Sequence, residues 1–186
     1  MEQNRPARRM DHIAPFYVMD LLAKAKELEA QGRAIIHMEV GEPDFDTPES
    51  VKAEAKRSLD AGFTGYTPAA GIPELRQSIS EHYRKTFGVT VDPNRIIVTP
   101  GSSGALQLIM GVLVNPGETV LMTDPGYPCN KHFVAAVNGI AAPIPVGPES
   151  SYQLTAELVE KNWDETTRAV MVATPSNPCL LYTSPS

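Results

Sequence analysis

Short apolar runs alternate with segments of helical periodicity from residue 95 to residue 173, and this alternation restricts the fold more than any other feature. The runs are continuous, as in strands that are buried on both faces of a parallel sheet. Parallel strands need long crossovers, which the helical segments supply. We therefore expect an α/β fold, with a mainly parallel sheet, flanking helices and right-handed crossovers. The expected strands are Arg95–Thr99, Thr119–Thr123, Ala141–Val146 and Arg168–Ala173, and the expected helices are Ser102–Val114, Asn130–Asn138 and one from a Thr155 cap to Trp163.

The first 94 residues predict three more helices and several ordered loops. Residues 1–14 resemble an irregular basic arm, and Ala34–Val40 is a short extended run. The helices are marked by apolar residues at helical spacing and by glycines at their ends. They are Pro15–Gln31, whose stripe includes Phe16 and which ends at Gly32; a helix capped by Thr47 with Pro48 in its first position and Gly62 at its end; and Leu75–Phe87, which is closed by Gly88.

Composition excludes several classes of protein. The formal net charge of −6 argues against nucleic acid or an anionic membrane as the main partner. No apolar run is long enough to span a membrane, and no apolar core follows the first arginines, as a secretory signal would require. Two cysteines give neither a disulfide framework nor metal spacing, so a reducing, cytoplasmic location is expected. The histidines also lack ligand spacing; they are His12, His37, His82 and His132.

In a parallel sheet, the site lies in loops at the carboxyl ends of the strands. The first such loop, TPGSSGAL (Thr99–Leu106), opens a helix with Ser102, Ser103 and Gly104. Free N–H groups at a helix start favour an anion such as phosphate. A plain glycine turn with a serine cap explains the same residues. A third interpretation is a hydrolase nucleophile at Ser103, but Ala105 replaces the last glycine of the Gly-x-Ser-x-Gly motif.

The other two loops carry Tyr127, in TDPGYPCN, and Asn177, in ATPSNP. Tyr127 could stack on a planar ligand or simply cover the sheet edge. Asn177 could donate to a ligand oxygen or belong to an ordinary Ser-Asn-Pro turn. A phosphate cradle, a stacking ring and an amide donor together suit a flat, phosphorylated, oxygen-bearing ligand.

Five stretches in order resemble fold-type I pyridoxal-phosphate aminotransferases of class I/II. They cover most of residues 13–178, and they are VGEPDFDTP (Val40–Pro48), GYTPAAGIPELR (Gly65–Arg76), IVTPGSSGAL (Ile97–Leu106), DPGYP (Asp124–Pro128) and ATPSNP (Ala173–Pro178). The resemblance implies a partial large domain with its sheet and helices, preceded by an arm and the first part of a small domain. It divides the chain into residues 1–47, 48–178 and a probable non-native tail, 179–186.

The resemblance also implies roles and a cofactor, pyridoxal 5'-phosphate. Ser102, Ser103 and Gly104 match the cofactor-phosphate turn, and Tyr127 matches the aromatic residue that stacks on the ring, where tryptophan is common. Asn177 matches the asparagine that bonds the ring hydroxyl oxygen. Gly41 matches the glycine that helps to hold the substrate carboxylate. Tyr66 matches the tyrosine that reaches the partner's cofactor in a homodimer, on which residues 1–14 would also pack.

The implied reaction transfers an amino group between an L-amino acid and a 2-oxo acid. The cofactor ring stabilises the carbanion at Cα, a lysine forms the resting Schiff base and moves the proton, and an acid and an arginine complete the site. In the family these last three groups follow the Asn-Pro segment. Here Cys179 replaces the expected threonine after Pro178, and CLLYTSPS resembles translated sequencing-adapter sequence. We therefore expect an inactive, poorly soluble amino-terminal fragment that lacks the Schiff-base lysine.

Two alternatives remain besides the hydrolase. Another fold-type I reaction, such as a C–S lyase, would use the same residues. A truncated homologue that only binds or associates would end with a genuine stop codon after Ser186.

Overall fold

The computed structural model describes residues 5–177. The chain divides into two compact units, one formed by residues up to Asp20 together with Ser103 onwards, and the other by Leu21–Ser102. Each unit is described by itself. The expected tail, residues 179–186, lies outside the described residues, and the expected domain boundary between residues 47 and 48 stays a prediction.

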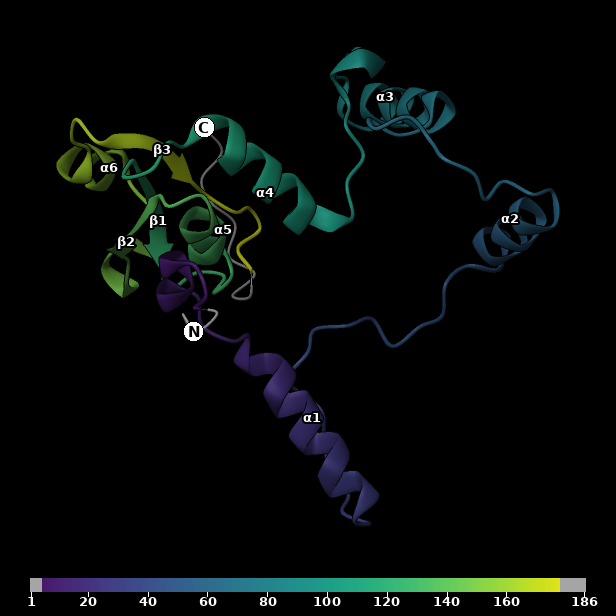
Figure 1. The fold of residues 1–186 in the computed structure, drawn as a ribbon, viewed down its shortest axis with the longest axis horizontal. Coiled ribbons are helices and arrows are strands. Elements are labelled where there is room, and N and C mark those ends of the chain that lie inside the picture. The colour runs from purple at the N-terminus through teal and green to yellow at the C-terminus, as the bar shows by residue number, and fades with distance from the viewer. Residues whose placement is uncertain (1–4, 178–186) are drawn as a thin grey trace. The chain divides into compact units, whose positions relative to one another are not determined.

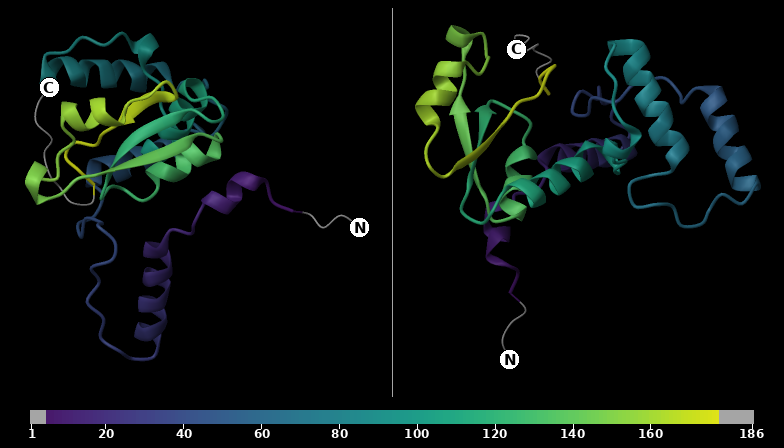
Figure 2. Two further views of the ribbon diagram at one scale, coloured as in Figure 1. Left: turned by 90° about the vertical axis from the view of Figure 1, so that its left-hand side faces the viewer. Right: turned by 90° about the horizontal axis from the view of Figure 1, so that it is seen from above.

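The first unit holds a three-stranded sheet in the order β2-β1-β3, and both pairings are parallel. The views of Figures 1 and 2 show the three strands side by side, with β1 in the middle. The predicted parallel α/β arrangement is therefore confirmed. Its elements are the 3₁₀ turn η1 (Arg8–His12), α4 (Gly101–Leu113), β1 (Thr119–Asp124), α5 (Asn130–Ala136), β2 (Ile140–Pro145), η3 (Pro148–Ser150), α6 (Ala156–Asn162) and β3 (Thr167–Met171).

Strand β1 is buried from Thr119 to Met122, as expected of a central strand in a parallel sheet. Its alternate residues Val120 and Met122 form a core cluster with the end of α4 and with Val134 of α5. The side chain of Thr119 avoids an unpaired buried hydroxyl by sharing a 2.9 Å hydrogen bond with the Thr166 hydroxyl. These contacts anchor the sheet from which the site loops leave.

The second unit contains helices and extended chain. Its helices are α2 (Glu49–Asp60) and α3 (Pro73–Phe87), and α1 (Tyr17–Ala30) begins four residues before the unit does. Helix α3 ends as predicted at Gly88, which has a left-handed φ of 69°. Helix α2 begins differently: Pro48, not Thr47, occupies the cap, and no side chain caps the helix.

The predicted strand Arg95–Thr99 is wrong. Pro93–Arg95 form the 3₁₀ turn η2, and the residues that follow are extended without a strand partner in residues 5–177. One backbone hydrogen bond of 3.0 Å, from Val98 N–H to the Ala70 carbonyl, joins these residues to the loop before α3 (Pro73–Phe87). Gly71 (φ 99°) makes this approach possible, since a Cβ there would lie 2.6 Å from Val98 Cγ2. An apolar, β-prone segment becomes a strand only where another strand pairs with it.

Within residues 5–177, no helix is both long and apolar enough to cross a membrane. The same residues contain no group of three or more potential metal ligands with metal-binding geometry.

Candidate active site

Helix α4 starts in the loop that was predicted to hold a phosphate. Gly101 has a left-handed φ of 72°, and the Thr99 hydroxyl donates a 2.8 Å bond to its carbonyl, which fixes the turn into the helix. Ser102 and Ser103 are exposed, and Gly104 is half-buried. The serines lie inside the first turn of the helix, so neither is the cap that the simpler interpretation required.

The amides of this first turn are available to a ligand. A helix leaves its first four N–H groups without an acceptor inside the helix. Among the described residues, no other group accepts from the amides of residues 101–104 or pairs with the two serine hydroxyls. In particular, no histidine among residues 5–177 makes a hydrogen bond with Ser103, which is the contact that the hydrolase interpretation requires.

Tyr127 and Asn177 follow the carboxyl ends of β1 and β3, which are paired neighbours with Met122 opposite Met171. Because the two strands are parallel, both loops leave the sheet at the same edge. Tyr127 is half-buried and Asn177 is exposed. Gly126 tightens the first of these loops, since a Cβ there would lie 2.7 Å from the Thr123 carbonyl oxygen.

The Tyr127 ring is held from two sides. Phe16 meets it edge to face, with the ring centroids 6.1 Å apart and the planes at 74°. Phe16 was predicted to lie in a helix stripe, but it precedes α1 and packs on this ring instead. The hydrogen bond with the Cys129 side chain, together with burial, raises the pKa of the Tyr127 phenol. The phenol therefore stays protonated at neutral pH.

Sequence reasoning missed Lys131 as a site residue. It was grouped with surface-helix lysines, yet it lines a pocket of about 380 Å³ together with Asp124 and Tyr127. The feature of the sequence that could have indicated this role is the position of Lys131, four residues after Tyr127 and at the start of α5.

The other two predicted residues lie in the second unit. Gly41 is exposed in the loop between the extended run and α2. Tyr66 is fully exposed at 110%, in the loop before α3. A side chain this exposed is free to contact another molecule.

A histidine links α1 to the chain that leads to Gly41. His37 Nδ1 lies 2.6 Å from a Glu39 oxygen, and His37 Nε2 lies 3.0 Å from a Glu29 oxygen. These hydrogen bonds, with Glu39 contributing most, raise the pKa of His37 above its ordinary 6.5, and the bond to His37 lowers the pKa of Glu39 below 4.5. Glu29 belongs to α1, so the His37 side chain joins the helix end to the extended run.

We expect this link to be strongest between the two shifted pKa values. Because the pKa of His37 is raised in the folded state, protonation of His37 stabilises the fold. This stabilisation is complete below pH 6.5 and is lost as the pH rises through the pKa of His37 in the folded state. Because the pKa of Glu39 is lowered in the folded state, ionised Glu39 also stabilises the fold. This stabilisation is lost as the pH falls through the pKa of Glu39 in the folded state. In an NMR titration, Glu39→Gln should lower the pKa of His37 more than Glu29→Gln, whereas Glu42→Gln serves as control. An unchanged His37 pKa in Glu39→Gln would contradict the geometry.

Known proteins resemble this chain over nearly all of its length. Residues 33–183 match the family described as aminotransferase class I and II. A transaminase of Methanocaldococcus jannaschii, named (5-formylfuran-3-yl)methyl phosphate transaminase, is 38% identical over 172 residues, which are 92% of this chain and 44% of the relative. A valine–pyruvate aminotransferase of Mycobacterium tuberculosis is 37% identical over 166 residues, which are 89% of this chain and 42% of the relative.

A solved structure of an aminotransferase is also similar to this chain. Aspartate aminotransferase from Thermus thermophilus with maleate superposes with a TM-score of 0.89 at 35% identity, over 95% of this chain and 46% of that one. The chain therefore spans less than half the length of the relatives that it matches.

Proposed function

Because the chain belongs to the class I and II aminotransferase family, we propose that it supplies part of the cofactor site of a pyridoxal-phosphate-dependent enzyme. The proposed reaction transfers an amino group between an L-amino acid and a 2-oxo acid. The observation that carries this proposal is the start of α4, where two exposed serines lie in one turn with backbone amides that have no acceptor among residues 5–177. The matched relatives differ in the substrates they are named for, so the proposal concerns the reaction class.

The residues present fit the phosphate of the cofactor. Backbone N–H groups at a helix start bind anions, and the positive end of the helix dipole adds to the attraction. The hydroxyls of Ser102 and Ser103 have no competing partner among the described residues, so each can donate to a phosphate oxygen.

The loops after β1 and β3 fit the ring. Tyr127 offers an aromatic face that Phe16 and Cys129 hold in one orientation. The exposed Asn177 amide can donate its N–H to a ring oxygen. When bound, the cofactor supplies an electron sink that stabilises negative charge at the Cα atom of an amino acid. In the proposal, Tyr127 and Asn177 orient that ring and Gly41 helps to hold the substrate carboxylate.

We also propose a homodimer in which Tyr66 reaches the phosphate of the partner's cofactor. Its complete exposure leaves the hydroxyl available for such a contact. The division into an arm with part of a small domain (residues 1–47) and part of a cofactor-binding domain (48–178) belongs to the same proposal, as does a cytoplasmic location.

The 186-residue chain by itself is expected not to catalyse amino transfer. Proton transfer at Cα requires a basic side chain within hydrogen-bond reach of the reacting atom. All seven lysines lie in helices, and none lies in the loops after β1 or β3 (Lys24, Lys26, Lys52, Lys56, Lys85, Lys131 and Lys161). Incubation with L-aspartate, 2-oxoglutarate and cofactor should produce no glutamate above background.

Cofactor binding can be measured without turnover. Pyridoxamine 5'-phosphate is the sharper probe, because it has no aldehyde to react with surface lysines. We expect saturable binding by equilibrium dialysis, weakened about tenfold in Ser103→Ala, which corresponds to one lost charge-assisted hydrogen bond. Ser78→Ala, in the middle of α3, is the matched control.

Two results would count against the proposal. One is the absence of saturable binding by a folded chain. The other is equal binding by the parent and Ser103→Ala, which would place the phosphate elsewhere.

A further inference from the structure

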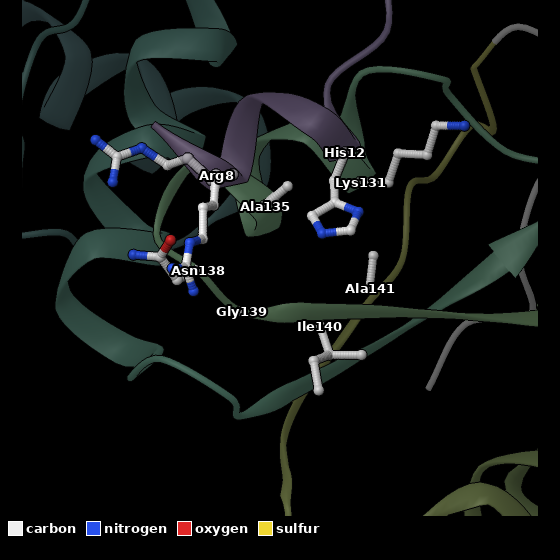
Figure 3. Close-up of a pocket in the computed structure, with 9 residues that line it drawn as sticks. Arg8, His12, Lys131, Ala135, Asn138, Gly139, Ile140 and Ala141 are labelled. Carbon is white, nitrogen blue, oxygen red and sulfur yellow. The ribbon is translucent and has the colours of Figure 1, made fainter. Parts of the chain in front are cut away.

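A second pocket lies in the first unit, between η1 and the segment that joins α5 to β2. It has a volume of about 440 Å³, within the range of small-molecule sites. Figure 3 shows Arg8 reaching from η1 toward Asn138, and His12 standing over Ile140 and Ala141. Lys131 stands at the rim opposite Arg8.

The lining of this pocket is basic in an acidic chain. Arg8, Arg9, His12 and Lys131 line it, and among residues 5–177 no carboxylate does. In residues 5–177, none of these four side chains makes an ion pair or a hydrogen bond, although other cations such as Lys24 and Lys52 pair with glutamates. The formal net charge of the chain is −6, so carboxylates are plentiful elsewhere. Cations gathered without counter-charges raise the local concentration of anions.

The floor of the pocket is fixed by the core. Asn138 adopts a left-handed φ of 61°, and its carbonyl accepts a 2.9 Å bond from Gly117 N–H. Gly139 lies so close to the core that a Cβ would meet Val114 Cγ1 at 2.8 Å and Val134 Cγ1 at 2.9 Å. On the other side, η1 packs against α5. The cations therefore project from a defined frame.

We propose that this pocket binds a small organic molecule with a doubly charged oxyanion group, that is, a phosphate monoester or a dicarboxylate. The forked N–H donors of Arg8 match the oxygens of both groups, and the His12 imidazole and the Asn138 amide add further donors. Ala135, Ile140 and Ala141 form an apolar wall on which the organic part can lie. This site is separate from the cofactor turn at the start of α4 and does not depend on the proposed amino transfer.

The test is equilibrium dialysis of the 186-residue chain, which records bound anion whether or not the chain associates. The probes are glycerol 3-phosphate and succinate, with glycerol as the neutral control. We expect saturable binding of at least one anion and none of glycerol. Arg8→Gln should weaken binding at least about tenfold, because a charge-assisted contact is lost. Arg5→Gln makes the same change of charge on the same arm, outside the pocket lining, and should change binding less than about twofold.

The variants separate this pocket from the cofactor turn, which could also take a phosphate ester. Binding that survives in Ser103→Ala and falls in Arg8→Gln assigns the anion to the basic pocket. Circular dichroism should match the parent in Arg8→Gln, since the Arg8 side chain makes no hydrogen bond within residues 5–177. His12→Gln is a second variant that should also weaken binding.

Several results would overturn the proposal. They are the absence of saturable binding of either anion, equal loss in Arg5→Gln and Arg8→Gln, and loss in Ser103→Ala with Arg8→Gln unaffected. If only one probe binds, that probe decides between the phosphate and dicarboxylate classes.

Discussion

Purified on its own, the 186-residue chain is expected to self-associate at concentrations at which a closed globular protein stays monomeric. The buried apolar core of the described residues has only eight side chains; six belong to α4, β1, α5 and β2, and Val114 and Val146 directly follow α4 and β2. Large apolar side chains remain exposed nearby: Val112 of α4 is 83% exposed, and Val172 after β3 is 58% exposed. Exposed apolar patches of this kind favour association.

The sheet adds a second cause of association. Among the described residues, β3 pairs only with β1, so one row of its backbone N–H and C=O groups lacks a strand partner. An open, apolar strand edge is a template for pairing with another chain. For the poor solubility predicted from the sequence, the described residues offer two local causes, the exposed face of α4 and the outer edges of β2 and β3.

Sedimentation velocity at about 10 μM, the micromolar range in which exposed apolar surface drives aggregation, would measure this association. Val112→Lys should lower the associated fraction severalfold, because it places a charge at the most exposed apolar side chain of α4. Gln107→Lys adds the same charge to the same helix at an exposed polar position and should have little effect. A monodisperse monomer of the parent chain, or equal effects of the two lysines, would refute this account.

The regular elements were predictable wherever local signals and burial agreed. The continuous apolar run at Thr119–Thr123 became the central strand, because both of its faces are covered. Gly88 and Thr155 act as predicted at helix ends: Gly88 takes up a left-handed φ, and the Thr155 hydroxyl accepts a bond from Leu158 N–H. Such signals depend only on neighbouring residues.

The failures arose where a second segment decides the outcome. Arg95–Thr99 has the composition of a strand, but no described strand pairs with it. The start of α2 was also predicted one residue too early, since Pro48 and not Thr47 is the cap residue. Phe16 contacts Tyr127, which lies far away in the sequence, and His37 in an extended run bonds to Glu29 in a helix. The spacing of apolar residues predicts neither contact. The basic pocket likewise exists only because η1 folds onto α5.

The candidate site was predicted mainly by resemblance. Spacing alone left Ser103, Tyr127 and Asn177 open to ordinary structural explanations. The structure adds that the loops of Tyr127 and Asn177 leave adjacent parallel strands, and that the serines at the start of α4 have no described partner. The site residues therefore stay a prediction, and dialysis with pyridoxamine 5'-phosphate tests whether they hold a ligand or form a simple turn.

Replacement of Leu121 by alanine is expected to destabilise the first unit by about 2–5 kcal/mol, the usual cost of a buried leucine-to-alanine change. Leu121 is only 1% exposed and lies in the central strand, opposite Ala142 of β2 and Val170 of β3. Small neighbours such as Ala142 cannot fill the space left by the lost methyl groups. Since a whole domain is stable by only about 5–15 kcal/mol, this loss would expose β1 to solvent in a measurable fraction of molecules.

The measurement is urea unfolding followed by circular dichroism, together with hydrogen exchange of the β1 amides, in a Val112→Lys background that limits association. Leu108→Ala makes the same chemical change on α4, where the side chain is 55% exposed, and should shift the free energy of unfolding by no more than about 0.5 kcal/mol. If Leu121→Ala and Leu108→Ala cost the same, the sheet does not form the core of a cooperative unit. A large loss confined to Leu121→Ala would establish that residues 103–177 fold as one unit around β1, which is the condition for the basic pocket and for Ser103, Tyr127 and Asn177 of the cofactor site to be in place.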